Sequence, residues 1–568
     1  MKRRQFLELS GRMATVAALS PYLLIKPGSP SPEFDLIIQN GTIINGLGEP
    51  AFEADIGVSN GKIRFIGQLA KDISRRPAKI IDAADRVVCP GFIDIHSHSG
   101  LELLVNPKAE SKIRQGVTTE LGGNCGSSDF PLKTELSEEA QQYWRDLGLK
   151  PTWIDLAGFR ERLLAQGISL NYATLVGHGT LRSLVMGDER RRPTAAELEK
   201  MKELVAAAME QGAFGLSTGL EYTPSGFAER EEIIELCRVV AEFGGFYATH
   251  VRSEDNQVIE AVSEAISIAK EAQLPLELSH LKACGQRNWW KMPFLFDLIE
   301  KGNARGIDVT ADAYPYTAYS TGLTVFFPHW ALAGGAKEFL RKMASAVERQ
   351  KMRPEVEEKL GGMPWESVVV VDLKTEKNKP LIGQNIAAAA KSRKQDSFDF
   401  SCDLLLEEDG EVSIVGFGMS DTNTEAVLRH PLVIIASDGS ALAPYGPLHR
   451  GLPHPRNYGT FPRFLGFYVR EKKILSLPEA IKKITLLPAA KMGLKDRGVL
   501  QTDYWADIVI FDPYKILDLA TYTGPEKYPV GIDYVLVNGQ VVIEHGEHTG
   551  ARPGKVLSNP KKRVGVGS

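Results

Sequence analysis

Two histidines, His96 and His98, stand two residues apart at the end of the largely apolar run 86–95. On a β-strand this spacing places both imidazoles on one face. Paired imidazoles make poor core residues, because each ring nitrogen needs a partner, but they are good ligands for a divalent metal. A single histidine after a strand is more often a hydrogen-bonded structural residue. The pair therefore predicts a metal site.

Further ligand-type side chains follow other apolar runs. Cys125 lies in Gly-Gly-Asn-Cys-Gly, where small neighbours let a thiolate approach a cation closely. His250 and His280 each end an apolar run, one β-α-β step apart, so both are expected on neighbouring strands of a barrel. Taken alone, these residues would be interpreted as a buried structural cysteine and two core histidines.

Asp438 stands in Ser-Asp-Gly-Ser at the end of the apolar run 432–438. By itself such an aspartate is typical of a turn or a helix cap. Beside a metal it is the natural general base. The metal lowers the pKa of bound water toward about 7, and a carboxylate can pass that proton to a leaving nitrogen. Together these residues predict a metal-dependent hydrolase.

The elements that must position these residues alternate through the middle of the chain. Helices are predicted at 194–211, 229–243 and 256–272, where apolar residues recur at i, i+3 and i+4. The predicted strands are 172–178, 214–218, 246–250, 275–280, 307–312 and 432–438. Such β-α repeats predict an α/β fold, a (β/α)8 TIM-like barrel over 89–490, with its active site at the carboxyl ends of the strands.

A charged, helix-rich stretch, about 331–410, breaks this alternation. We expect it to be an insertion over the barrel mouth, a lid.

Short strands at both ends of the chain predict a small β-sandwich domain. Its N-terminal part is 33–88 and its C-terminal part is 491–557, followed by a tail, 558–568. Asn40-Gly41 and Asn60-Gly61 are typical of hairpin turns. Each stretch is too short to bury a face alone, so both ends are expected to combine.

The first 32 residues have a different character. A basic head with Arg3 and Arg4 precedes a weakly apolar stretch, 13–25, and a segment rich in Pro, Ser and Gly. The apolar stretch is shorter than the roughly 20 residues that a membrane helix needs. The paired arginines before Phe-Leu look like a twin-arginine signal. We expect export, to the periplasm, or a cytoplasmic location if this segment is only a basic tail. The sequence does not decide whether this signal is cleaved or remains as an N-terminal membrane anchor.

The overall composition is that of an ordinary globular protein. The chain has 568 residues, of which 43% are hydrophobic and 24% charged. A net charge of −4 argues against nucleic acid or an anionic membrane as the main partner. Five widely spaced cysteines form no disulfide framework. The oligomeric state is not predicted.

As a set, the motifs resemble those of the D-aminoacylases (N-acyl-D-amino-acid deacylases), a family of the amidohydrolase superfamily. The resemblance covers roughly 34–557, nearly the whole chain after the N-terminal segment. The motifs that carry it are Gln-Gly-Val-Thr-Thr at 115–119, Gly-Asn-Cys-Gly at 123–126, Ser-His-Leu-Lys at 279–282, the His-Pro-Arg run at 454–462, Gly-Ile-Asp-Tyr-Val-Leu-Val-Asn-Gly at 531–539 and Thr-Gly-Ala-Arg-Pro-Gly at 549–554.

This resemblance implies a metal centre with one tightly bound zinc. Cys125, His250 and His280 match its ligands, and His96 and His98 match a second, weaker site that is empty or filled. Many amidohydrolases bridge two metals with a carboxylated lysine, where this subgroup has a cysteine. Asp438 matches the catalytic aspartate.

The resemblance also implies substrate-binding residues. Lys282 and Arg456 match residues that hold the substrate carboxylate, for which a bidentate guanidinium is well suited, although either could be a solvated surface charge. Tyr222 matches a tyrosine near the scissile carbonyl, and aromatic packing explains it equally well. The segment before the His-Pro-Arg motif, 440–453, is longer than in the family. This puts the position of Arg456 in doubt and makes Arg450 and His449 alternative contributors.

The implied activity is zinc-dependent hydrolysis of N-acyl-D-amino acids, small-molecule substrates, to a carboxylate and a free D-amino acid. A D-specific metallodipeptidase is one alternative, because it needs the same metal and the same grip on a carboxylate. A cyclic-amide hydrolase of dihydroorotase or hydantoinase type is disfavoured by Cys125 and the His-Pro-Arg motif. An inactive exported binding protein is disfavoured because every expected ligand and the aspartate are present.

Overall fold

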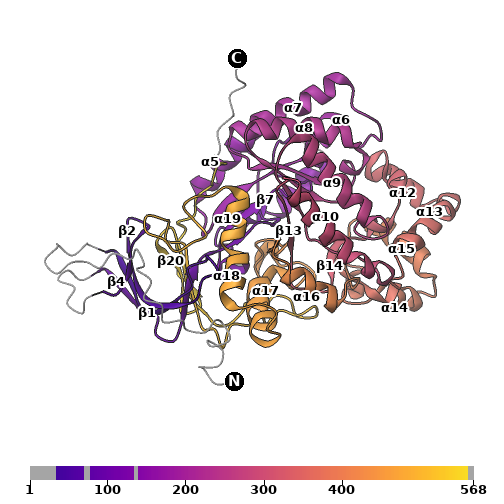
Figure 1. Cartoon of the computed structure of the whole chain (residues 1–568). Helices are drawn as coiled ribbons and strands as arrows, with labels where there is room; N and C mark the ends of the chain where they lie inside the picture. Colours follow the sequence, from indigo (N-terminus) through magenta and orange to yellow (C-terminus); the bar gives the residue numbers. More distant parts are fainter. Residues whose placement is uncertain (1–33, 70–76, 134–137, 561–568) are drawn as a thin grey trace, which may run out of the picture.

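The structure is a computed structural model that describes residues 34–69, 77–133 and 138–560 (Figure 1). The predicted export segment, 1–32, lies outside these ranges, as do residues 561–568 of the predicted tail. Within the described ranges, no helix combines the length and the apolar character needed to cross a membrane.

Parallel strands from the middle of the chain close into a barrel. A three-stranded sheet, β6-β7-β8, continues into a six-stranded sheet, β9-β10-β11-β12-β13-β17, because β8 and β9 are successive segments of one strand. On the other side, a parallel bridge joins Ser97, after β6, to Gly439, after β17. The described residues thus confirm the predicted eight-stranded barrel. Its strands are β6 (Phe92–Asp94), β7 (Val117–Gly122), β8 (Asn171–Thr174), β9 (Val176–Gly177), β10 (Gly215–Gly219), β11 (Phe246–His250), β12 (Leu276–Leu278), β13 (Val309–Ala313) and β17 (Val433–Ile435).

Helices cover the outer face of the barrel (Figure 1). The three predicted helices form close to their predicted bounds, as α7 (Ala195–Glu210), α8 (Arg230–Glu242) and α9 (Val258–Ala272). A capping box between Thr194 and Glu197 starts α7 and satisfies amide donors that a helix leaves open. The other helices of this layer and its loops are α2 (Leu101–Val105), α3 (Glu110–Ile113), α4 (Glu138–Asp146), α5 (Leu156–Gln166), α6 (His178–Met186), α10 (Met292–Ala304), α16 (Asp421–Arg429), α17 (Arg456–Arg463), α18 (Leu477–Ile484) and α19 (Leu486–Met492).

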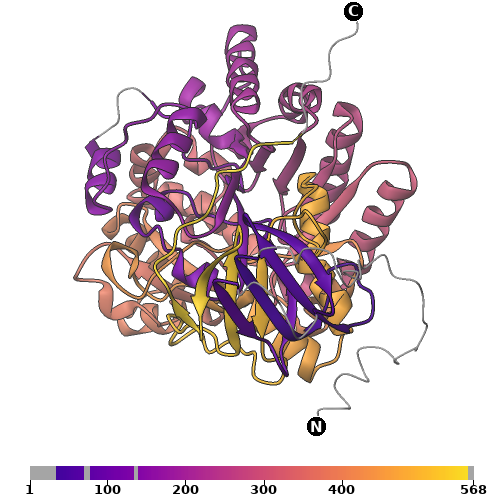
Figure 2. The ribbon, with the colours of Figure 1, turned by 90° about the vertical axis from the view of Figure 1, so that its left-hand side faces the viewer.

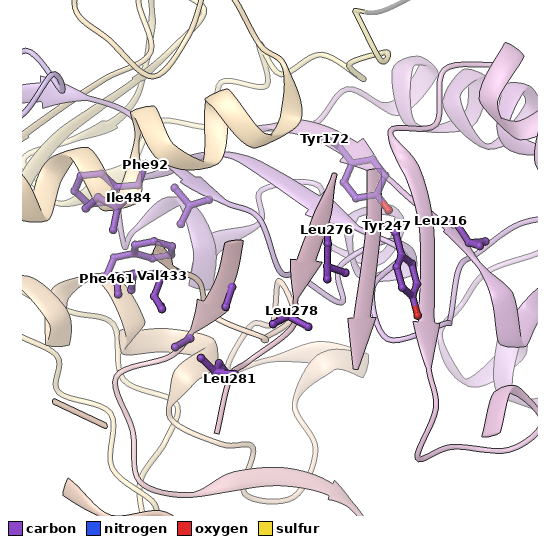
Figure 3. Close-up of a cluster of buried hydrophobic side chains, with 14 of the residues drawn as sticks. Phe92, Tyr172, Leu216, Tyr247, Leu276, Leu278, Leu281, Val433, Phe461 and Ile484 are labelled. Atoms are coloured by element: carbon purple, nitrogen blue, oxygen red, sulfur yellow. The ribbon is translucent and has the colours of Figure 1, made fainter. Parts of the chain in front are cut away.

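The barrel strands are buried on both faces, as parallel sheets covered by helices are. Tyr247 of β11 and Leu276 of β12 belong to the large core between strands and helices (Figure 3). Phe246 and Ala248, the neighbours of Tyr247, belong instead to a separate cluster with Ile434 of β17. This alternation follows the two-residue period of a strand and makes a rigid frame for the residues at the strand ends.

Strands from both chain ends share one hydrogen-bonded sheet, seen in Figure 2 with indigo N-terminal strands beside yellow C-terminal ones. β5 (Val87–Pro90) joins the two sets, because it pairs with β1 (Leu36–Ile43) and with β18 (Ile508–Phe511). The remaining strands are β2 (Phe52–Ser59), β3 (Lys62–Gly67), β4 (Lys79–Asp82), β19 (Ile532–Val537), β20 (Gln540–Glu544) and β21 (Glu547–His548). The prediction that both chain ends build one small β-domain is confirmed.

One predicted turn of this domain is wrong. Asn60-Gly61 does connect β2 to β3, since Ser59 pairs with Lys62. Asn40-Gly41 lies inside β1, where the pairing with β2 shifts register between Ile38 and Gly41. Asn40 has a φ of 59°. The left-handed conformation that Asn-Gly favours serves a β-bulge as well as a hairpin turn, and the local sequence does not distinguish them.

A compact unit of residues 319–416, here called the insertion, lies between β13 and β17 and carries its own three-stranded sheet. This sheet consists of β14 (Tyr319–Gly322), β15 (Val368–Leu373) and β16 (Val412–Gly416). Its buried cluster, which includes Phe339 and Ile414, is separate from the barrel core. The predicted range 331–410 lies within this unit but leaves out β14 and β16, which are too short to carry a clear strand pattern. Its helices are α11 (His329–Leu332), α12 (Gly335–Met343), α13 (Ala346–Lys359), α14 (Ile386–Ser392) and α15 (Ser397–Glu407).

Candidate metal centre and active site

The predicted ligand-type residues all stand at the carboxyl ends of barrel strands. They are His96 and His98 after β6, Cys125 after β7, His250 at the end of β11, His280 after β12 and Asp438 after β17. Strands far apart in the sequence are neighbours in the barrel, so these side chains meet at its mouth.

Cys125 lies at the middle of this group. Its Sγ is 3.4 Å from His96 Nε2 and 3.4 Å from His280 Nε2. His280 Nε2 is 3.0 Å from His250 Nδ1. Bonds of about 2.3 Å to sulfur and about 2.0 Å to nitrogen place two ligand atoms of a tetrahedral zinc roughly 3.5 Å apart. The donor atoms are therefore spaced as ligands of a common ion would be.

Asp438 connects the two predicted ligand sets. Its Oδ1 is 2.8 Å from His98 Nε2 and 3.3 Å from His96 Nε2. Ligand atoms of His96, Cys125, His280 and Asp438 all lie within 4.8 Å of one another. The pair His96 and His98 and the set containing Cys125 thus form one continuous centre.

Three of these histidines have a buried carboxylate against their second ring nitrogen. The pairs are His96 Nδ1 with Asp312 Oδ2 at 3.0 Å, His250 Nε2 with Glu221 Oε2 at 3.0 Å, and His280 Nδ1 with Glu254 Oε1 at 2.8 Å. Such carboxylates fix the tautomer and the ring orientation and raise the basicity of the nitrogen that faces a metal. The arrangement is typical of metal-binding histidines.

Sequence reasoning missed all three carboxylates. Asp312 carried a usable signal, because it closes the predicted strand 307–312 just as Asp438 closes another. Glu221 and Glu254 stand in loops after β10 and β11, where a glutamate is usually a solvated charge. Here both are buried, with 6% and 8% of their surfaces exposed.

Buried charges of both signs meet in the centre. Burial opposes ionisation of the Cys125 thiol, but His96 and His280 outweigh it and hold the pKa of this thiol well below its ordinary value. Burial likewise opposes ionisation of Asp438, and Arg456 and His96 hold its pKa well below the usual range. A thiolate and a carboxylate among imidazoles are a donor set that suits zinc, so the residues present fit a divalent metal.

The backbone is unusual at three of these residues. Cys125, His280 and Asp438 have φ values of 50°, 37° and 50°. Residues other than glycine rarely adopt positive φ, and where they do the site is often functional. Hydrogen bonds hold the conformation, since His280 N donates to Asp312 Oδ1 at 2.8 Å and Asp438 N donates to His96 O at 2.8 Å.

A buried lysine, Lys112, holds the loop around Asp438. Its Nζ donates to Asp94 Oδ2 at 2.7 Å, to Ser437 Oγ at 2.6 Å and to Gly439 O at 2.8 Å. The residues on both sides of Asp438 are therefore tied to β6 through one ammonium group. Sequence reasoning did not predict this role, because a lysine gives no sign of burial in a single sequence.

Two cavities meet at the centre. An outer cleft of about 860 Å³ reaches Cys125, Asp438 and Arg456. A smaller inner cavity reaches Asp438 and Lys282 and is closed by residues of the insertion. Tyr222 lines both. A small molecule that enters the outer cleft can therefore contact the metal-ligand candidates and the insertion together.

The three predicted substrate-binding residues all line these cavities. Arg456 NH1 forms an ion pair with Asp438 Oδ2 at 2.7 Å, and neither NH1 nor Nε makes a hydrogen bond with good geometry among the described residues. The Tyr222 ring lies against His250 at a tilt of 56°, with 4.7 Å between ring centroids, and its hydroxyl is 3.1 Å from Thr321 Oγ1.

The long segment 440–453 does not displace Arg456, which begins α17 within reach of Asp438. Arg450 and His449 are exposed and line a different cavity, and His449 Nδ1 is 2.6 Å from Glu526. Of the three alternatives, the structure brings only Arg456 to the centre.

Tyr314, which sequence reasoning did not identify, lies between the two predicted carboxylate-binding cations. Its ring centroid is 4.9 Å from Arg456 Cζ and 5.9 Å from Lys282 Nζ. Its buried hydroxyl has no hydrogen-bond partner within the described part of the chain. Lys282 Nζ also contacts Glu254 and lies 2.9 Å from His280 Nδ1. Lys282 and Tyr314 line the inner cavity, which also contains the carboxylates of Glu254 and Asp438, and Arg456 lines the outer cleft. Two cations and an unpaired hydroxyl thus lie where the two cavities meet, and such groups are suited to an anion.

Comparison with known proteins matches residues 79–327 and 362–543 to the amidohydrolase family. D-aminoacylase of Alcaligenes xylosoxydans xylosoxydans is 36% identical over 530 residues, which cover 93% of this chain and 99% of that protein. N-acyl-D-glutamate deacylase of the same organism is 34% identical, over 94% of this chain and 98% of its own. The crystal structure of N-acyl-D-glutamate deacylase of Bordetella bronchiseptica, complexed with zinc and a phosphonate inhibitor, superposes with a TM-score of 0.78. The two chains are 31% identical, over 93% of this chain and 100% of that one.

Proposed function

This chain belongs to the amidohydrolase family, and we propose that it is a zinc-dependent hydrolase that cleaves the amide bond of N-acyl-D-amino acids. The products are a carboxylate and a free D-amino acid. One observation carries the proposal: the Cys125 thiol meets His96 and His280 at 3.4 Å beside Asp438, at the mouth of the barrel. The names of the similar proteins support the substrate class.

In this proposal Cys125, His250 and His280 hold one zinc tightly, and His96 and His98 contribute to a second, weaker site. The carboxylate partners of these imidazoles support the assignment, because they keep a lone pair directed inward. When bound, zinc supplies a Lewis acid for the amide carbonyl and increases the acidity of water in the site.

Asp438 is the proposed general base and acid. It accepts the proton of the attacking water and delivers it to the departing nitrogen. Its position supports both steps, since its carboxylate lines the outer cleft and the inner cavity. Its low pKa keeps it ionised, and so able to accept a proton, at neutral pH. Lys112 keeps this carboxylate in place through Ser437 and Gly439.

Lys282, Arg456 and Tyr314 bind the substrate carboxylate in this proposal, and Tyr222 lies near the scissile carbonyl. Charge-assisted hydrogen bonds from a lysine and a guanidinium are well suited to a carboxylate. Selection of the D-enantiomer follows from three fixed points, namely the metal, this carboxylate site and the pocket for the side chain.

The test is a substrate panel on the zinc-loaded protein. N-acetyl-D-amino acids are compared with their L-forms, with D-containing dipeptides and with cyclic amides such as hydantoins. We expect kcat/KM for the N-acetyl-D-amino acids to exceed that for the L-forms by roughly two orders of magnitude or more. In an L-form the substrate carboxylate would be misplaced and would leave buried cations unpaired. Faster turnover of dipeptides or cyclic amides would assign one of the alternative activities instead. No turnover of any of them by zinc-loaded protein would point to the inactive binding protein.

We also propose that the protein is exported from the cytoplasm. The support is in the sequence, where Arg3 and Arg4 precede Phe-Leu and a short apolar stretch. Replacing both arginines with lysine is expected to retain the protein in the cytoplasm, as measured by cell fractionation. An unchanged distribution would rule out the twin-arginine route.

A further inference from the structure

Two helices of the insertion contact the same residue beside the metal centre, Glu221. Lys359, the last residue of α13, has its Nζ 3.3 Å from Glu221 Oε1. His329, the first residue of α11, donates from Nε2 to the carbonyl oxygen of Glu221 at 3.0 Å. Two helices of the insertion therefore hold the side chain and the main chain of a single residue in the loop after β10.

Glu221 connects the insertion to His250 of the barrel. Its second oxygen, Oε2, is 3.0 Å from His250 Nε2, and the other nitrogen of that ring, Nδ1, is 3.0 Å from His280 Nε2. A carboxylate whose one oxygen is held by a lysine keeps the other oxygen in a fixed direction. Without the lysine, the glutamate regains rotamers that do not face the histidine.

The other two histidine-carboxylate pairs are held within the barrel. Asp312, the partner of His96, accepts from the main-chain nitrogen of His280. Glu254, the partner of His280, accepts from Lys282. His250 Nε2 lies 3.0 Å from Glu221 and 3.8 Å from Glu254, so Glu221 is its closer carboxylate partner. Among the described residues, Glu221 is the histidine partner that pairs with a cation from the insertion.

We propose that Lys359 is a positioning residue of the metal centre, which acts through Glu221 to orient His250, so that the insertion completes the zinc site. The proposal deepens the proposed function and rests on it for the identity of the metal. It adds a structural role for the insertion that is distinct from covering the substrate. A disturbance of α13 then weakens metal binding even when every direct ligand is intact.

The test measures zinc affinity of the full-length protein by competition with a chromophoric chelator, without any substrate. Removing a residue that orients a ligand typically lowers metal affinity about 10- to 100-fold. We expect Glu221→Ala to fall within this range and Lys359→Met to raise the zinc Kd by about 10-fold. Lys359→Arg, which keeps the positive charge, is expected to restore most of the affinity.

Lys351→Met is the matched control. Lys351 lies on the same helix, is exposed and pairs with Glu348 at 2.7 Å, so its loss should leave zinc affinity unchanged. Circular dichroism and the urea midpoint verify that each variant is folded. Equal zinc affinity in Lys359→Met and the wild type, equal losses in Lys359→Met and Lys351→Met, or failure of Lys359→Arg to restore binding would each overturn the proposal.

A double variant tests whether the lysine acts through the glutamate. If Lys359 works by holding Glu221, Lys359→Met should cost little further zinc affinity once Glu221→Ala is present, because interacting residues are not additive. Fully additive losses would overturn the proposal. Because the assay uses zinc alone, this pattern of affinities can be found even if N-acyl-D-amino acids are not hydrolysed. Failure of the proposed function is thereby distinguished from failure of this inference.

Discussion

Replacing Asp438 with asparagine tests the chemical step most directly. The carboxylate lies between His98 Nε2, at 2.8 Å from Oδ1, and Arg456 NH1, at 2.7 Å from Oδ2. Asparagine has nearly the same shape and can still accept a hydrogen bond from His98, but it cannot take a proton from water. General acid–base catalysis contributes about 10²- to 10⁴-fold to a rate, which is about 3 to 5 kcal/mol of barrier.

We therefore expect kcat of Asp438→Asn to fall by about 10²- to 10⁴-fold, with a smaller change in KM. Because Asp438 also belongs to the cluster of metal-ligand candidates, zinc per chain is measured on the same sample by atomic emission. Asp255→Asn is the control, since Asp255 lines the inner cavity without contacting a histidine ring. Near-normal turnover of Asp438→Asn with a full complement of zinc would refute the assignment of the base.

Three further substitutions test the ligand, the substrate site and the pH dependence. Cys125→Ser removes the thiolate that zinc prefers, and we expect zinc per chain to fall after dialysis against a chelator; retention of the metal would contradict the ligand assignment. Lys282→Met should raise KM by roughly tenfold or more, because a charged hydrogen bond contributes about 1.5 to 3 kcal/mol, and an unchanged KM would exclude Lys282 from the carboxylate site. Burial raises the pKa of Glu120 to about 7 against the opposing effect of Lys112. The folded state then binds this proton more tightly than the unfolded state, so Glu120 lowers the free energy of unfolding as pH rises from its ordinary pKa to about 7. Glu120→Gln should lose less stability than the wild type between pH 5 and pH 8 in urea unfolding, and identical losses would contradict the argument.

The sequence signals for the residues that the fold brings together at the barrel mouth share one property. His96, His98, His280 and Asp438 each follow a run of apolar residues, and in a barrel the ends of such runs meet at one face. Residue type and position along a strand are local features, so they can be found in a single sequence. The register of Asn40-Gly41 shows the limit of this reasoning, because the same two residues stabilise a turn or a bulge and only the pairing with β2 selects between them.

The residues that were missed work through contacts between distant segments. Glu221, Glu254 and Lys112 are ordinary charged residues in the sequence, and they become parts of the site because the fold buries each one against an opposite charge or a ring nitrogen. The same holds for Lys359, whose helix belongs to another unit of the chain. Burial raises the strength of such pairs, and burial is a property of the whole structure.

By itself the sequence determined the kind of protein: an α/β barrel with imidazoles, a thiol and a carboxylate at its strand ends. This follows because the periodicity of apolar residues and the chemistry of each side chain are properties of short stretches of sequence. The tertiary structure decided which nitrogen of each histidine faces inward, that Arg456 reaches Asp438, and that the insertion contacts the centre through Glu221. These features depend on how segments hundreds of residues apart pack together, because a hydrogen bond acts over a few ångströms in space, whatever the separation along the chain.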